Sequence, residues 1–170
     1  MPLKPVVEHP SPLLRQCAAS VDRFDGSLAR LAQDLIDTLL PTTGIGISAP
    51  QLGQAKRVVV LELSDRTAAA EVFVNPAVVS KSGFGVIQES CLSLPGIKGN
   101  VIRATNVLVQ AFTLDGVAFE RQLEGMAAVA MLHEIDHLDG VLFIDRLTLP
   151  GRLKYKWSQR QAARATAQAA

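Results

Sequence analysis

The sequence GMAAVAMLHEIDHL, which runs from Gly125 to Leu138, is the most informative stretch of the chain. It is rich in alanine, methionine and leucine and contains no proline, a composition that favours an α-helix. Gly140 follows shortly after, and glycine is common just beyond the end of a helix. We therefore expect a helix over residues 125–138.

Two of the three histidines lie in this helix, in the motif HEIDH of residues 133–137. Positions i and i+4 share one face of a helix, so the imidazoles of His133 and His137 can bind one cation. Glu134 then lies where a carboxylate can take and return protons of a water whose pKa a metal lowers toward ~7. An exposed helix with two coincidental histidines is the alternative, and the apolar composition argues against it.

A catalytic metal site of this kind usually has three protein ligands and one open position, so a third ligand is needed. No histidine follows His137, and the carboxylates close behind it are Asp139 and Asp145. Cys91, in the segment ESCLS, is the better candidate because a thiolate is a strong ligand for borderline and soft metals. We therefore expect Cys91 to complete the ligand set.

A third segment, GIGISAPQ of residues 44–51, satisfies the glycine-rich pattern of dinucleotide-binding loops. That pattern requires a strand before it and a helix that opens within it. Here a leucine-rich helix precedes the segment, and Pro50 would interrupt a following helix. We instead expect a loop over residues 44–53, in which two glycines bring the backbone close to a ligand and Gln51 offers an amide donor.

The remaining segments predict helices and strands in separate blocks, which favours an α+β fold over a doubly wound one. Leucines at helical spacing predict a first helix, with Asp25 as its cap and Pro41 as its end. These leucines are Leu28, Leu31, Leu35 and Leu39. Strands are predicted over residues 57–63, 72–74, 101–112 and 117–123, and Asp115-Gly116 marks a hairpin turn between the last two. A basic helix is predicted over residues 151–166.

Composition narrows the possible classes of protein. The 170 residues fit one domain, and a hydrophobic content of 48% excludes disorder. With 17 Lys+Arg and 16 Asp+Glu, no strong global charge attracts the chain to DNA or to a membrane surface. We see no signal peptide, and no apolar run approaches the roughly 20 residues of a membrane span. Only two cysteines occur, and Cys17 is interpreted as a small buried apolar residue. We expect a cytoplasmic protein.

Taken in order, GIGISAPQ, ESCLS and HEIDH resemble the peptide deformylase family. Its members typically show G-φ-G-φ-A-A-x-Q, E-G-C-φ-S and Q-H-E-x-D-H, where φ is apolar, and the resemblance extends from about Pro10 to Leu147. It implies one catalytic domain over residues 1–170, with residues 151–170 as a basic C-terminal helix or tail. The implied fold is α+β: antiparallel β-sheets pack around a central metal-binding HExxH helix, with an N-terminal and a C-terminal helix.

The resemblance also implies roles for individual residues. Cys91, His133 and His137 bind the metal, and Glu134 is the general acid and base. The amide of Gln51 and the backbone N–H of Leu92 form the oxyanion hole. Residues expected at the substrate are Ile45, Gly46 and Ser90 along its backbone, Ile87, Met126, Val129 and Ala130 around the first side chain, and Glu89, paired with Arg103, near the site.

The implied reaction removes the formyl group from the N-terminal formyl-methionine of newly synthesised polypeptides and releases formate. The implied cofactor is one divalent metal ion, with iron(II) preferred and zinc, nickel or cobalt as alternatives, although a Cys-His-His set suits zinc well. Formylmethionyl nascent peptides are the expected partners. The basic C-terminal residues form either a solvated helix face or a contact with the ribosome, and they are Arg152, Lys154, Lys156, Arg160 and Arg164.

The sequence departs from the family pattern at four positions. Ser48 replaces an alanine, Ser90 a glycine and Leu132 a glutamine, and Lys98 stands where some members have an arginine. Because the expected ligands and the glutamate remain, we expect these changes to affect rate and peptide preference rather than the class of reaction.

Two other functions compete with deformylation. An endopeptidase of the HExxH kind would need a third ligand after His137. A purely structural metal site usually has four protein ligands, and it would leave Glu134 without a role.

Overall fold

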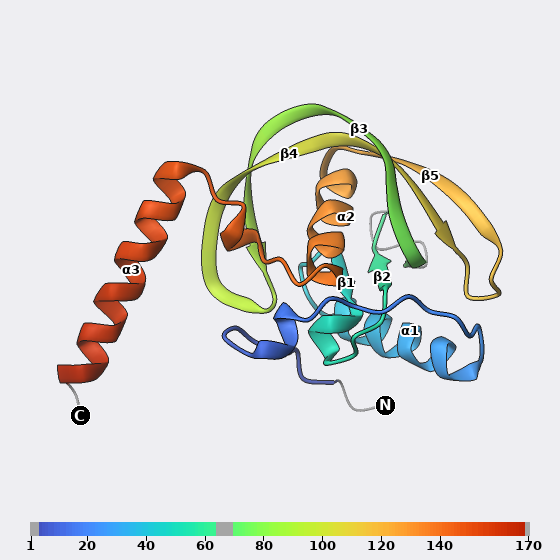
Figure 1. Ribbon diagram of the computed structural model, residues 1–170, viewed down its shortest axis with the longest axis horizontal. Coiled ribbons are helices and arrows are strands. Elements are labelled where there is room, and N and C mark those ends of the chain that lie inside the picture. Colours follow the sequence, from blue (N-terminus) through green and yellow to red (C-terminus); the bar gives the residue numbers. More distant parts are fainter. Residues whose placement is uncertain (1–3, 64–69, 169–170) are drawn as a thin grey trace.

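The computed structural model describes residues 4–63 and 70–168, with side chains up to residue 161. In these described residues, three α-helices and one five-stranded antiparallel sheet, in the order β1-β2-β3-β4-β5, form the fold (Figure 1). The α+β class is confirmed, and the expectation of several sheets is corrected to one sheet in the described chain. In order, the elements are the 3₁₀ turn η1 (Pro12–Arg15), α1 (Gly26–Leu39), β1 (Gly46–Ser48), η2 (Ala49–Leu52), β2 (Val58–Leu61), β3 (Glu71–Cys91), β4 (Leu94–Phe112), β5 (Ala118–Glu124), α2 (Gly125–Leu138), η3 (Phe143–Asp145) and α3 (Leu149–Gln168).

The sheet curves around α2, and the long strands β3 and β4 arch over it (Figure 1). Helix α2 contacts β1, β2, β4 and β5, which is why one mostly apolar helix can be buried on several sides. Met131 and Leu138 pack into a core cluster with Phe73 and Val107. The helix that carries the HEIDH motif therefore lies at the centre of the fold.

Helix α1 forms the layer that supports β1 and β2. The Asp25 carboxylate accepts a hydrogen bond from the backbone N–H of Ser27 at 2.8 Å, as the capping prediction requires. The four predicted leucines are buried and pack against residues of the first two strands, Ile47, Val58 and Val60. This packing holds β1 beside β2 at the edge of the sheet.

Two segments differ from the sequence prediction. The predicted loop over residues 44–53 contains the strand β1 and the 3₁₀ turn η2. The predicted strand of residues 72–74 is only the beginning of β3, which continues through Pro76 to Cys91. A register shift lies between Val74 and Ala77, and a bulge of this kind accommodates proline inside a strand. As a result, Cys91 is the last residue of a strand in a long hairpin.

The predicted β4–β5 hairpin, the α2 helix and the C-terminal helix are confirmed, although α3 begins earlier than expected, at Leu149. Helix α3 extends away from the body of the molecule (Figure 1). The side chain of Arg164 lies outside the described residues. Cys17 is exposed, which corrects the expectation that it is buried. None of the described helices combines the length and the apolar character that a membrane crossing requires.

Candidate active site

A cleft of about 540 Å³ opens between β1, the end of β3, the start of β4 and α2. It is lined by most of the predicted site residues, namely Ile45, Gly46, Gln51, Glu89, Ser90, Cys91, Leu92, Met126, Val129, Ala130, His133 and Glu134. Neither Ile87 nor His137 is among the described residues that line the cleft. The place of Ile87 beside the substrate stays a prediction. The fold thus brings three separate sequence motifs to one cavity.

Cys91, His133 and His137 form a cluster that can hold a metal ion. Their ligand atoms all lie within 4.8 Å of one another, and Cys91 Sγ is 3.2 Å from His137 Nε2. A tetrahedral site with a metal–sulfur distance near 2.3 Å and a metal–nitrogen distance near 2.1 Å would place such atoms about 3.6 Å apart. The three side chains therefore fit a single divalent cation.

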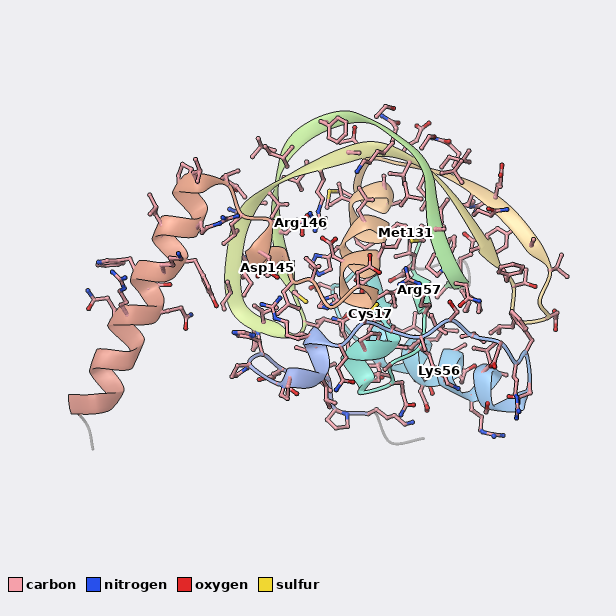
Figure 2. The ribbon with its side chains drawn as sticks, in the orientation of Figure 1. Cys17, Lys56, Arg57, Met131, Asp145 and Arg146 are labelled. Atoms are coloured by element: carbon pink, nitrogen blue, oxygen red, sulfur yellow. The ribbon has the colours of Figure 1, made fainter. Side chains whose placement is uncertain are left out.

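The two carboxylates that are alternatives to Cys91 as the third ligand form ion pairs with arginines instead. Asp139 pairs with Arg57 at 2.7 Å, and Asp145 pairs with Arg15. Figure 2 shows Asp145 and Arg146 in the segment between α2 and α3, to the left of α2, and Arg57 to the right of α2 in this view. Of the three candidates, Cys91 is the one that lies beside both histidines.

His133 is oriented by Glu89, near the end of β3. Its Nδ1–H donates to Glu89 Oε2 at 2.8 Å, which directs Nε2 toward the cluster. Burial by itself would lower the pKa of His133, but the hydrogen bonds to Cys91 and Glu89 raise it to about 10. Burial also raises the pKa of Glu89, but hydrogen bonds from His133 and Arg103 outweigh it and bring the pKa to about 2. The negative groups that hold a proton on His133 would also favour a metal cation, which would replace that proton on binding.

His137 has the opposite electrostatic surroundings. Its burial lowers its pKa to about 3, and the nearby positive charges of His133 and Arg103 act in the same direction. Metal binding needs a neutral imidazole, so this histidine is held in the form that coordinates a metal.

Arg103, on β4, links helix α2 to strand β3 through buried ion pairs. Its guanidinium donates to Glu89 Oε1 and to Asp136 Oδ2, each at 2.6 Å. Arg146 donates to the other oxygen of Asp136 at 2.9 Å. The Glu89–Arg103 pair was expected, whereas the roles of Asp136 and Arg146 were missed. The place of Asp136 within the HEIDH motif was the one available signal.

Glu134 is buried against β1, on the same helix as the two histidines. The backbone of Gly46 lies so close that an added Cβ would be 3.1 Å from the Glu134 carboxylate oxygen Oε1. Ser48 Oγ donates to Glu134 Oε2 at 2.8 Å. Burial is the main reason that the pKa of Glu134 is raised, and the Ser48 hydrogen bond acts against it. A carboxyl group with a raised pKa is suited to move protons near neutral pH.

Gln51 lies on η2 with its amide oxygen turned away from Cys91. Its Oε1 accepts the backbone N–H of Ser48 at 2.9 Å. Its Nε2 faces Cys91 Sγ at 3.7 Å and Ser93 Oγ at 3.3 Å. The amide therefore points its donor end toward the cluster, where negative charge on an oxygen can be stabilised.

Cys91, His133, the buried Glu134 and the amide donor Gln51 thus line one cleft on an α+β scaffold, and the third possible ligand, His137, lies beside Cys91. Hydrolysis assisted by a metal needs these parts: a cation, a carboxylate for the proton and a donor for the developing oxyanion. The fold and the site together define a metal-dependent hydrolase.

Comparison with known proteins gives the family. A sequence model described as polypeptide deformylase matches residues 3–152. A peptide deformylase from Acidobacterium capsulatum is 42% identical over 150 residues, covering 87% of this chain and 88% of the relative. One from Chromobacterium violaceum is 37% identical over 163 residues, covering 95% and 98%. The crystal structure of a peptide deformylase from Legionella pneumophila aligns with a TM-score of 0.86 at 36% identity, covering 97% and 98% of the two chains.

The chain belongs to the polypeptide deformylase family. It is a hydrolase that removes the N-formyl group from newly synthesised polypeptides.

Proposed function

We propose that Glu134 is the general acid and base of deformylation and that Gln51 and the backbone N–H of Leu92 stabilise the oxyanion. The observation that carries this proposal is the position of the buried Glu134 carboxylate, which lines the same cleft as Cys91 and His133. A divalent metal bound by Cys91, His133 and His137 would act as a Lewis acid and lower the pKa of water toward ~7.

In the proposed reaction, Glu134 transfers one proton in two successive steps. The carboxylate first takes a proton from the water that attacks the formyl carbon. As the carbon–nitrogen bond breaks, Glu134 gives that proton to the leaving amine. The products are formate and a polypeptide with a free N-terminus. Gln51 Nε2 and the Leu92 N–H donate to the formyl oxygen while it carries negative charge.

The substrate backbone fits the edge of the sheet. β1 is an edge strand, and the cleft is lined by Gly44, Ile45 and Gly46 at its start. An extended peptide can add to such an edge through main-chain hydrogen bonds. Ser90 would hold the opposite side of the peptide. Met126, Val129 and Ala130 would then surround the first side chain, and we keep Ile87 in that pocket as a prediction.

Iron(II) is the metal that we infer for the enzyme in the cell, with nickel or cobalt as active substitutes and zinc as a poor one. Cys-His-His ligation accepts all of these ions, so ligand type does not choose between them. Our argument is that an iron ion held by Cys91, His133 and His137 would polarise the formyl group more readily than zinc would. Turnover and metal content of iron-, nickel- and zinc-loaded protein test this, and equal turnover with all three would contradict it.

The test of the proposed function is formate release from formyl-Met-Ala-Ser. We expect Glu134→Gln to retain the metal and to lose activity by about 10²–10⁴-fold, because the amide cannot accept the proton. We expect Cys91→Ala to weaken metal binding itself. Cleavage within a longer peptide, without formate, would instead indicate an endopeptidase. A Glu134→Gln variant with normal turnover would overturn the assigned role of Glu134.

We also infer that the C-terminal helix α3 contacts the ribosome, and that the enzyme works in the cytoplasm, where nascent chains emerge. The described basic side chains of α3 are exposed, and they include Arg152, Lys154, Lys156 and Arg160. Such a surface suits the phosphates of RNA. The domain as a whole is proposed to be one catalytic unit over residues 1–170.

A further inference from the structure

Ser48 is the last residue of β1, and its side chain is fully buried. It stands behind the cleft, because it is not among the described residues that line the cavity. Its hydroxyl oxygen is 2.8 Å from Glu134 Oε2 and 3.1 Å from Gln51 Oε1. One buried hydroxyl therefore touches both the acid/base carboxylate and the oxyanion amide.

We propose that Ser48 is a positioning residue for deformylation, which ties Glu134 to Gln51 through its hydroxyl group. This inference rests on the roles assigned to these two residues above. Ser48 itself does not reach the substrate, so it acts through its two partners. The family pattern usually has alanine here, so the serine affects the rate of the reaction rather than its nature.

The single hydroxyl proton of Ser48 can be donated to Glu134 or to Gln51, but not to both. The hydroxyl has one proton and faces two acceptor oxygens. Gln51 Oε1 already accepts the Ser48 backbone N–H at 2.9 Å, whereas a carboxylate oxygen forms the stronger, charge-assisted hydrogen bond. The hydroxyl proton therefore goes to Glu134 Oε2. Because a hydroxyl also accepts, Ser48 Oγ can keep the same contact after Glu134 has taken the proton of water.

The other contacts of Glu134 make this hydrogen bond important for its orientation. On the Gly46 side, the carboxylate meets a backbone that presents no side chain. Replacing Ser48 by alanine would remove a donor from Oε2 and leave space for the carboxylate to rotate. The orientation of Gln51 should survive, because the backbone N–H of residue 48 still binds its Oε1. The loss should therefore appear in the chemical step and not in substrate binding.

The first test is the steady-state kinetics of Ser48→Ala with formyl-Met-Ala-Ser. We expect kcat to fall about ten-fold, the effect of one charge-assisted hydrogen bond, with KM and metal content unchanged. Ser48→Thr keeps the hydroxyl and should restore most of kcat. The matched control is Thr38→Val, because Thr38 is also buried and donates its hydroxyl at 2.7 Å to Asp34 O in α1, within the helix that supports β1. This control should change the unfolding temperature at most.

The second test does not depend on activity. The infrared carboxylate band that Glu134→Gln abolishes belongs to Glu134, and we expect Ser48→Ala to shift that band while Thr38→Val leaves it in place. A kcat within about two-fold of wild type, with an unmoved band, would refute the role of Ser48. If Glu134→Gln is fully active, the assigned role of Glu134 fails instead, and the two failures are thereby distinguished.

Discussion

At the scale of single residues, Gly46 shows how the fold makes room for Glu134, the proposed acid/base group. A Cβ at this position would be 2.7 Å from Leu61 Cδ2 and 3.1 Å from Glu134 Cγ. Leu61 is fully buried, so neither neighbour can move away without cost. The glycine that the sequence pattern places near a ligand is thus also required by the glutamate of a helix far along the chain.

Gly46→Ala should therefore damage both stability and catalysis. We expect a loss of about 1–3 kcal/mol in the free energy of unfolding from overpacking. We also expect kcat to fall about 10–100-fold, because a small displacement of Glu134 misplaces the proton transfer. Urea unfolding and formate release measure the two effects. Gly85→Ala in β3 is the control, since its nearest neighbour would be at 3.9 Å. Equal behaviour of the two variants would show that crowding at Gly46 is unimportant.

The ion pair between Arg15 and Asp145 gives a pH-dependent contribution to stability. Burial raises the pKa of Asp145, but hydrogen bonds from Arg15 and the Leu142 N–H outweigh it and lower the pKa. A lowered folded-state pKa stabilises the protein above the unfolded value of about 3.9, and this contribution is lost as the pH falls through the folded value.

Asp145→Asn keeps an oxygen for the Leu142 N–H and removes the charge. We expect it to lower the free energy of unfolding by about 0.5–1 kcal/mol at pH 7, because the pair is partly exposed. The difference from wild type should shrink below about pH 4. Urea unfolding at several pH values tests this, with Asp115→Asn in the exposed β4–β5 turn as control. A difference that is independent of pH would contradict the electrostatic origin.

At the scale of elements, the buried ion-pair chain joins three of them. Arg103 is on β4, Glu89 on β3 and Asp136 on α2, and each is at most 6% exposed. Removing the arginine would leave Glu89 with His133 and Asp136 with the partly exposed Arg146 as remaining partners, and it would take one positive charge from two buried carboxylates. This is more costly than losing a surface pair.

We expect Arg103→Met to lower the free energy of unfolding by about 3–5 kcal/mol. It should also weaken metal retention, because Glu89 no longer has the partner that orients it toward His133. Thermal unfolding and elemental analysis measure the two losses. Arg121→Met is the control, since its pair with Glu71 at 3.2 Å is partly exposed, with side chains 49% and 31% accessible, and should change stability by less than about 1 kcal/mol. Comparable losses in both variants would argue against a special role for the buried chain.

Elements with strong local signals were predictable, and those fixed by distant contacts were not. The HEIDH helix and the Asp25-capped helix follow from spacing and capping residues, and both are confirmed. Most of β3 was missed because Ser80, Lys81 and Ser82 offer no apolar alternation and Pro76 suggested an end. What makes this segment a strand is its pairing with β4 over nearly its whole length. Pairing partners cannot be inferred from one strand alone.

The same distinction holds for the site. The proposed metal ligands and Glu134 are chemically specific residue types in recognisable motifs, so the sequence alone predicts them. Asp136 and Ser48 have ordinary identities, and their importance comes from what lies opposite them in space. Ser48 meets Glu134 across 86 positions of sequence, a contact that only the packing of β1 on α2 creates.

At the scale of the whole molecule, helix α3 is distinct from the part of the chain that forms the sheet and the cleft. The family match ends at residue 152, and α3 extends away from the sheet (Figure 1). Leu149, Leu153 and Trp157 are 65–75% exposed, so this helix buries little apolar surface against the body. Among the described side chains of α3, Tyr155 packs partly against the cluster around Phe143. The cleft contains no residue of α3 among those that line it.

Deleting residues 151–170 should therefore separate catalysis from ribosome binding. We expect formate release from a short peptide to remain within about two-fold of wild type, with a modest fall in the unfolding temperature from the loss of Tyr155. Co-sedimentation with ribosomes should disappear, and in the intact protein it should weaken steeply between low and moderate salt, because phosphate contacts release counterions. A variant with Lys154, Lys156 and Arg160 all changed to glutamine keeps the helix and should bind as poorly as the truncation. Undiminished sedimentation of the truncated protein would exclude α3 as the ribosome contact, and intact binding by the glutamine variant would show that its charges are not what the ribosome recognises.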